Sequence, residues 1–447
     1  MEQIGSYKRA YIHKLLLVAY FVLSLYYSII DGWAVHLFIM TLVLMTTLII
    51  LIIEDRVLRY LLLAAFIIRL ILALLQANTA IELVGPGSDS SMFELAGWQN
   101  AQAWIAGEGA PRATGAFYYS AFIGALYFIF GRVPFLIQLF SVVFGVAIVF
   151  IIYRITLKLT TSKIAAYLAL TIATLFPTLN LFSAVILREV YMLFFVLYSF
   201  YFFIDWVEEG RYKSMALSGV MSICAGIFHG AMLLISWIQY FLFALYNPIR
   251  QTFRITLKNV IVIVGLSLFV FILFNVDVIT YRFPASINDL VSLDTFQSLV
   301  SNRRVGRTQY LEDLVPFSYF DVLRQTPIRA LYFLLAPFPW MIENKLDLAM
   351  FFENISYIVM IILSVFGYGK VTKQKRVAYI AMLIIVFTII FMFSWGTVNY
   401  GTAWRHKLKI APFVIIMASI SLSSMFESIK GRLLNDKKSD HAEVSAG

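Results

Sequence analysis

The chain has 447 residues, of which 61% are hydrophobic and only 13% are charged, and its mean hydropathy is +0.85. Soluble domains carry about 25% charged residues, so the composition excludes an ordinary soluble protein. The net charge of +10 does not indicate a nucleic-acid partner, because most basic residues form short clusters between apolar runs. The composition predicts an all-α, polytopic integral membrane protein built as one membrane domain.

The first apolar run, about 15–31, follows Lys8, Arg9 and Lys14, as the apolar part of a signal peptide would. It is long enough to span a bilayer and has no small-residue cleavage site, so we expect a retained helix. The single cysteine, Cys224, excludes an intramolecular disulfide.

Apolar runs of spanning length recur along the whole chain. They predict twelve transmembrane helices over 15–31, 34–53, 58–76, 133–153, 164–180, 185–206, 214–229, 231–247, 257–275, 348–367, 377–395 and 408–424. With a cytoplasmic N-terminus, the basic clusters fall on the inside at every second gap, as the positive-inside rule requires. We therefore expect a multi-pass plasma-membrane protein with both termini in the cytoplasm.

Two further apolar segments, 116–131 and 327–340, do not fit as spans, because counting either one as a crossing would move the next basic cluster outside. We expect them to be juxtamembrane or re-entrant helices within two long outer loops, so the active site is predicted on the outer face. The expected organisation is N-terminal helices 1–76, first outer loop 77–132, central helices 133–275, second outer loop 276–347, C-terminal helices 348–430 and cytoplasmic tail 431–447.

Asp89 opens a helical pattern in the first outer loop. Ser91, with Glu94 three residues later, has the pattern of a capping box, so Asp89 fits the cap of a helix. A carboxylate at that position also fits a general base at the mouth of a membrane cavity. The sequence leaves both roles open.

Three more residues stand at or near membrane depth. Glu189 lies at the outer end of a predicted span, Arg69 lies near the middle of another, and His229 lies where two helices meet. Charges at this depth normally face the bundle interior or a cavity. Glu189 is therefore either functional or paired with Arg188 or Arg69. Arg69 has either a carboxylate partner or a ligand role, and His229 either bonds structurally or acts in catalysis.

The second outer loop carries arginines but no lysine over residues 276–326. Guanidinium groups bind phosphate through two parallel hydrogen bonds, which favours an anionic ligand. The six acidic residues of the same segment leave ordinary ion pairing open. The candidates are Arg282, Arg303, Arg304, Arg307 and Arg324, joined from the last outer loop by Arg405, which alternatively anchors that loop at the interface.

Several motifs are missing from the sequence. There is no Walker A loop, no CxxC pair and no HExxH motif, which argues against an ATP-driven pump or a redox enzyme. No metal ligands are predicted and no cofactor is certain, although a divalent metal stays open.

Five pieces follow in a recognisable order over residues 85–230: Ser88-Asp89-Ser90, Phe117-Tyr118-Tyr119, Leu175-Phe176-Pro177, Arg188-Glu189 and His229-Gly230. This order resembles the GT-C superfamily of membrane glycosyltransferases. It is similar to that of protein O-mannosyltransferases and lipid A aminoarabinose transferase. Pro337-Phe338-Pro339-Trp340 and Arg405-His406-Lys407 resemble features of bacterial surface-polysaccharide members.

The resemblance implies that a polyprenyl-phosphate-linked sugar is transferred to a glycan or lipid acceptor on the outer face. It implies Asp89 as the base, Glu189 as a second acidic residue, and His229 at the lipid phosphate, where relatives often have a lysine. The serine after Asp89, the glutamate at 189 and the histidine at 229 depart from the family pattern, as do two extra N-terminal helices. These departures leave donor and acceptor open.

Two other functions remain as alternatives. A polymerase of lipid-linked oligosaccharide repeat units would also have about a dozen helices and a long outer loop with arginines. A lipid-linked sugar flippase or transporter is the third hypothesis, although the sequence lacks the symmetric pair of interrupted helices typical of transporters.

Overall fold

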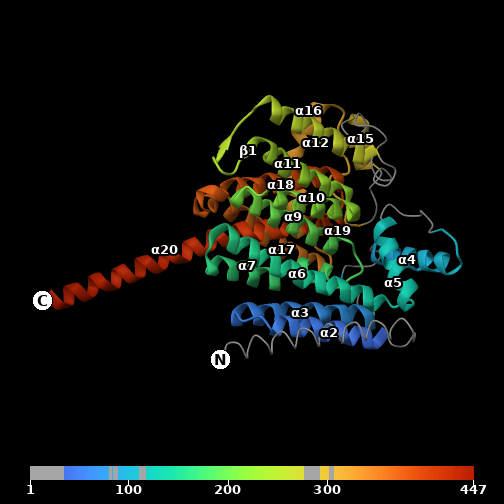
Figure 1. Cartoon of the computed structure of the whole chain (residues 1–447), viewed down its shortest axis with the longest axis horizontal. Coiled ribbons are helices and arrows are strands. Elements are labelled where there is room, and N and C mark those ends of the chain that lie inside the picture. Colours follow the sequence, from blue (N-terminus) through green and yellow to red (C-terminus); the bar gives the residue numbers. More distant parts are fainter. Residues whose placement is uncertain are drawn as a thin grey trace. The chain divides into compact units, whose positions relative to one another are not determined.

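A computed structural model describes residues 35–79, 83, 89–109, 117–275, 292–301 and 307–446 (Figure 1). The predicted all-α class is confirmed, since these residues are helical almost throughout. Where the composition indicated one membrane domain, the chain divides into two compact units. Unit 1 comprises Met1–Ala147 and Asn180–Tyr191, and unit 2 comprises Ile148–Leu179 and Met192–Gly447.

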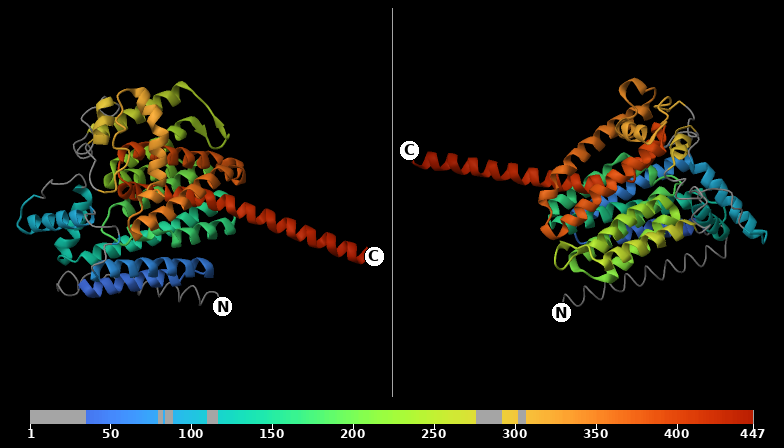
Figure 2. Two further views of the ribbon diagram at one scale, coloured as in Figure 1. Left: turned by 180° about the vertical axis from the view of Figure 1, so that it is seen from behind. Right: turned by 90° about the horizontal axis from the view of Figure 1, so that it is seen from above.

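Unit 1 holds the elements that carry Asp89 and Glu189. Its helices are α2 (Val35–Leu51), α3 (Arg56–Asn78), α4 (Asp89–Ile105), α5 (Phe117–Phe130), the first part of α6 (Pro134–Thr160), the end of α8 (Pro177–Phe182) and the first residues of α9 (Glu189–Glu209). α2 and α3 lie side by side, as do α4 and α5 (Figures 1 and 2). Asp55 begins α3 as its N-cap, because its side chain accepts the Leu58 N–H at 3.0 Å.

The α4–α5 pair is tightly packed because glycines lie where the two helices meet. A Cβ atom added at Gly124 would lie 2.9 Å from Asn100 Cβ and 3.1 Å from the backbone oxygen of Gly97. The same pair is tied by Glu94, whose carboxylate accepts hydrogen bonds from Arg132 Nε at 2.9 Å and Tyr127 Oη at 3.0 Å.

The capping box predicted for Ser91 and Glu94 is wrong. α4 begins at Asp89, so Ser91 lies inside its first turn. Glu94 bonds to Arg132 and Tyr127 instead of reaching back to the start of the helix. The Glu94 carboxylate therefore accepts from Arg132 and Tyr127 in place of the backbone N–H group that a capping box would use.

Unit 2 contains the rest of α6, α8 and α9 and all later elements. The helices are α7 (Lys163–Leu175), α10 (Tyr212–Phe228), η1 (Gly230–Met232), α11 (Leu233–Leu245), α12 (Leu257–Asn275), α15 (Leu293–Ser301), α16 (Tyr319–Leu335), η2 (Pro339–Met341), α17 (Lys345–Phe366), η3 (Tyr368–Lys370), η4 (Lys373–Lys375), α18 (Arg376–Gly396), α19 (Tyr400–Lys407) and α20 (Ala411–Ala446). Between α11 and α12, β1 (Tyr246–Asn247) and β2 (Thr252–Phe253) form a short antiparallel hairpin.

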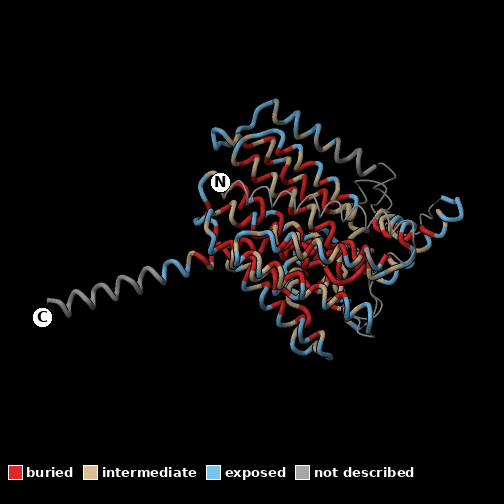
Figure 3. The backbone as a smooth tube through the Cα atoms, turned by 60° about the horizontal axis from the view of Figure 1, so that its bottom comes forward, coloured by how far each residue is buried: buried red, intermediate tan, exposed pale blue. Residues whose placement is uncertain are grey.

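The core of unit 2 lies around the first half of α20. Both α7 and α17 pack against this helix, and α16 packs against α18. The tube of α20 is buried where it begins and becomes exposed farther along (Figure 3). Elsewhere in the unit, Ser199 of α9 bonds to Ser222 of α10 at 2.8 Å and to Gln239 of α11 at 2.8 Å. Such polar contacts between helices are typical of membrane bundles.

Six described helices are long and apolar enough to cross a membrane: Arg56–Asn78, Pro134–Thr160, Glu189–Glu209, Lys345–Phe366, Lys373–Gly396 and Ala411–Ile429. Each lies close to a predicted span. Shorter apolar helices, such as α7 and α11, match others, and the predicted span 15–31 lies outside the described residues. The polytopic class is thus supported, whereas the number twelve and the orientation stay predictions.

The two segments set apart from the spans are short or interrupted helices. α5 has 14 residues, or about 21 Å at 1.5 Å per residue, which is less than the hydrocarbon core of about 30 Å. α16 ends at Leu335 and η2 begins at Pro339, so the segment 327–340 is interrupted between these two helices. The juxtamembrane placement of both segments stays a prediction.

Replacing Gly124 with valine should loosen the α4–α5 pair. The added side chain overlaps Asn100 and the Gly97 backbone, so we expect the free energy of unfolding to fall by about 1–3 kcal/mol. Gly109→Val is the matched control, since nothing lies within 4 Å of a Cβ atom there. Equal denaturant midpoints for the two purified variants would contradict the packing described.

Candidate active site

Asp89 is the first residue of α4 and is half-buried. Phe93, one helical turn later, lies on the same face of the helix. The guanidinium of Arg188 lies over the Phe93 ring, 5.7 Å from its centre, a cation–π contact. The face of α4 that begins with Asp89 therefore meets the residue next to Glu189.

Glu189 begins α9, and only 1% of it is exposed. A carboxylate in the first turn of a helix is favoured by the helix dipole, which explains locally why an acid stands there. Tyr119 of α5 interacts electrostatically with both Glu189 and Arg188. The Tyr119 ring also packs edge-on against Phe93 at 5.4 Å. Glu189 thus belongs to an aromatic and cationic cluster within unit 1 that reaches α4 at Phe93, one turn after Asp89.

Arg69 is fully buried on α3. Its Nε donates to Ser183 Oγ at 3.0 Å, and its Nη1 donates to the Ala65 carbonyl at 3.1 Å. Gly145 of α6 permits this contact, because a Cβ atom there would lie 2.5 Å from Ser183 Cβ and 3.0 Å from Arg69 Nε. Arg69 therefore anchors the segment that leads to Glu189. The carboxylate partner and the ligand role considered for Arg69 both stay predictions.

A second cluster of basic residues lies in unit 2 around Phe393. His229 ends α10 and faces the Phe393 ring at 6.1 Å, while the His406 ring lies 4.3 Å from the same ring. Lys409 lies over Phe393 at 4.7 Å, and its Nζ is 2.8 Å from His406 Nδ1. A lysine ammonium has only donors, so His406 accepts at Nδ1 and carries its proton on Nε2. Half-buried Arg405 precedes His406 on α19. The predicted phosphate ligands His229 and Arg405 therefore lie on elements brought together by Phe393.

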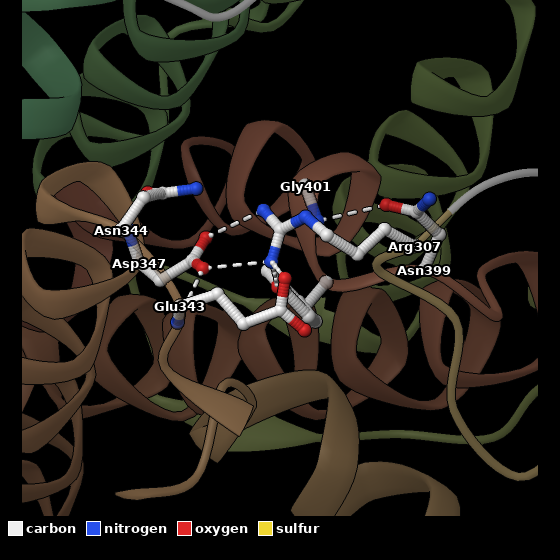
Figure 4. A network of polar contacts seen from close by, with 7 residues as sticks. Arg307, Glu343, Asn344, Asp347, Asn399 and Gly401 are labelled. Carbon is white, nitrogen blue, oxygen red and sulfur yellow. Dashed lines mark hydrogen bonds and ion pairs between the residues drawn. The ribbon is translucent and has the colours of Figure 1, made fainter. Parts of the chain in front are cut away.

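Arg307 is held by carboxylates (Figure 4). Its Nη1 and Nη2 donate to the two oxygens of Asp347 at 2.9 and 3.2 Å, and Nη1 lies 3.1 Å from Glu343. The hydrogen bond to Asp347 raises the pKa of Arg307 above its ordinary value. A phosphate would have to compete with these acids, so the phosphate role predicted for Arg307 stays a prediction. Arg282, Arg303 and Arg304 lie outside the described residues.

Several buried ionisable residues of unit 2 were assigned no role from the sequence, although Lys407 was noted in the Arg405-His406-Lys407 resemblance. Glu353 lies on α17, Lys407 ends α19, and Arg329 lies on α16 over the Trp395 ring at 4.2 Å. A signal was present in the sequence, because Glu353 falls inside an apolar run of spanning length, where a charge points to function or pairing.

No group of three or more His, Cys, Asp or Glu side chains is placed to hold a metal ion in the part of the chain that the structure describes. The described residues therefore contain no ligand set for the divalent metal that the sequence left open.

The family described as dolichyl-phosphate-mannose-protein mannosyltransferase matches residues 110–291. No curated protein matches the chain. Over residues 110–291 the chain is similar to this GT-C family of membrane glycosyltransferases. The matched region contains Glu189, His229 and Arg282, whereas Asp89, Arg69, Arg307 and Arg405 lie outside it.

The anchor between Arg69 and Ser183 is testable by a double-mutant cycle in the purified protein. Arg69→Met and Ser183→Ala should show a coupling of about 1–2 kcal/mol in unfolding free energy, because a buried charged donor loses its acceptor.

Thr47→Ala supplies the control for this cycle, since the Thr47 hydroxyl donates within its own helix, to the Val43 carbonyl. Its effect should add to that of Arg69→Met within about 0.5 kcal/mol. A similarly small coupling for Ser183→Ala would contradict the anchor.

Proposed function

We propose that the chain transfers a sugar from a polyprenyl-phosphate donor to a glycan or lipid acceptor on the outer face of the plasma membrane, in cell-surface polysaccharide or glycolipid synthesis. The family match supports a membrane glycosyltransferase that uses such a donor. Because the matching family transfers mannose from dolichyl phosphate, a polyprenyl-phosphate-linked mannose is the first donor to test.

In the proposed step Asp89 is the general base. Its carboxylate takes the proton of the acceptor hydroxyl while that oxygen attacks the anomeric carbon of the donor. The bond between the anomeric carbon and the phosphate oxygen breaks, and the polyprenyl phosphate leaves with the electron pair. The contact of Arg188 with Phe93 is the observation that supports this role most, since it brings the helix begun by Asp89 to the Arg188-Glu189 pair.

Cationic residues are assigned to the phosphate. Negative charge grows on the leaving phosphate as the glycosidic bond breaks, and fixed cations and N–H donors stabilise that charge. His229 and Arg405 are proposed for this role because both belong to elements that meet at Phe393. Arg69 is proposed to support the Glu189 segment, and Arg282, Arg303 and Arg304 stay candidate phosphate ligands.

Asp89→Asn should abolish transfer while leaving the protein folded. Loss of a general base lowers kcat by about 10²–10⁴-fold. The measurement is sugar transfer from polyprenyl-phosphate sugar in membranes that contain equal amounts of each variant. Glu189→Gln is expected to reduce transfer as well, whereas Glu108→Gln, an exposed carboxylate beyond the end of α4, should retain it.

The same assay separates the alternatives. Full activity of Asp89→Asn would reduce Asp89 to a residue that favours the start of α4. If Arg282, Arg303 and Arg304 variants lost activity under that condition, the repeat-unit polymerase would become the better account. Movement of the intact lipid-linked sugar across the membrane without bond cleavage would favour the flippase.

A further inference from the structure

Helix α19 is short and is fixed at both ends within unit 2. At its start, the Asn399 side chain accepts the N–H groups of Gly401 and Thr402 at 2.8 and 3.1 Å. Tyr400 accepts a hydrogen bond from Arg307 at 2.9 Å. With eight residues, an isolated helix would not be stable in water, so its placement depends on such tertiary contacts.

The second half of α19 is held by neighbouring residues of α17. Trp404 Nε1 donates to Glu353 Oε2 at 3.0 Å, and Lys407 Nζ donates to the Asn354 side chain and to the Leu334 carbonyl at 3.3 Å. Asn354 in turn donates to the Leu335 carbonyl at 3.0 Å. Lys407 and Asn354 thus satisfy carbonyls at the C-terminal end of α16, which have no partner inside that helix.

Glu353 and Lys407 are both ionisable residues in the interior of unit 2. Glu353 is 4% exposed and Lys407 is 0% exposed, and the two interact electrostatically. Burial lowers the pKa of Lys407, while the Glu353 carboxylate partly restores it. Each charge therefore compensates the other, and removing one alone leaves a buried charge without its counter-charge.

The anchor at Lys407 matters because it also fixes the direction in which Arg405 and His406 face. Residues two apart on a helix do not share a face, so Lys407 anchors one side while Arg405 lies on another. His406, between them, packs on Phe393, which also faces His229. Any shift or rotation of α19 would move Arg405 and His406 together.

We propose that Glu353 and Lys407 are positioning residues, which hold α19 so that Arg405 and His406 are directed at the phosphate of the lipid donor. The proposal rests on the proposed function, because it takes a polyprenyl-phosphate sugar as the donor. Neither residue contacts the donor in this proposal. Their effect on the reaction passes through the placement of α19.

The test compares five variants with the wild type in full-length protein reconstituted in lipid nanodiscs, with polyprenyl-phosphate mannose as the donor. They are Lys407→Met, Glu353→Gln, the double variant with both changes, Arg405→Gln and Lys375→Met. Lys375 is a matched control, because it is a buried lysine that pairs with Glu208 at 2.9 Å and is not on α19. The donor KM, kcat and the thermal midpoint are measured for each.

We expect Lys407→Met to raise the donor KM about tenfold with a smaller change in kcat, as for loss of binding geometry. The double variant should recover only part of this loss: the unpaired carboxylate is gone and the introduced amide oxygen can still accept from Trp404, but the hydrogen bonds of Lys407 to Asn354 and Leu334 stay absent. Lys375→Met should lower the thermal midpoint without changing the donor KM.

Two outcomes would overturn the positioning role: an unchanged donor KM in folded Lys407→Met, or a loss of stability in all Glu353 and Lys407 variants that leaves KM unaffected. A raised KM in Lys407→Met with no effect of Arg405→Gln would support the placement of α19 and contradict the phosphate role of Arg405. Absence of transfer by the wild type from any polyprenyl-phosphate sugar would contradict the proposed function, and with it the donor-directed role of the pair.

Discussion

The arrangement of the helices depends on the free-energy cost of burying a charge where no water can solvate it. Inside a bilayer, a charged group must find its partners within the protein. Arg69 meets this condition with Ser183 and a carbonyl of its own helix, and Glu353 meets it with Lys407 and Trp404. Because Ser183 and Lys407 lie on other segments than the charges they contact, each buried charge also favours the meeting of two distant segments.

The candidate residues in each unit are placed by the same constraint. In unit 1, Arg69 fixes the segment before Glu189, and Arg188 brings that segment to the helix that begins with Asp89. In unit 2, the Glu353–Lys407 pair and Arg307 fix the two ends of α19, which carries Arg405 and His406. Arg69, Glu353 and Lys407, which have partners inside the protein, thus serve as anchors. Other residues, such as Asp89 and Arg405, carry the proposed chemistry.

Hydropathy predicted the helices well, because spanning length and apolar composition are properties of a local stretch. The span predicted over 58–76 lies within α3, and the segment 116–131, set apart by the positions of the basic clusters, contains α5. The partners of the buried charges were not predictable in this way, since Ser183 lies 114 residues from Arg69 in the sequence. Glu353 was missed although its position inside an apolar run was visible. Glu94 was assigned to a helix cap because its observed partner, Arg132, is 38 residues away, beyond the C-terminal end of α5.

The most direct test is to supply purified protein in nanodiscs with a polyprenyl-phosphate sugar labelled in both the sugar and the lipid, together with a glycan acceptor and no nucleotide sugar. The account predicts that each sugar transferred to the acceptor releases one polyprenyl monophosphate. Release of a polyprenyl diphosphate from a lipid-linked oligosaccharide, with no use of the monophosphate donor, would contradict it.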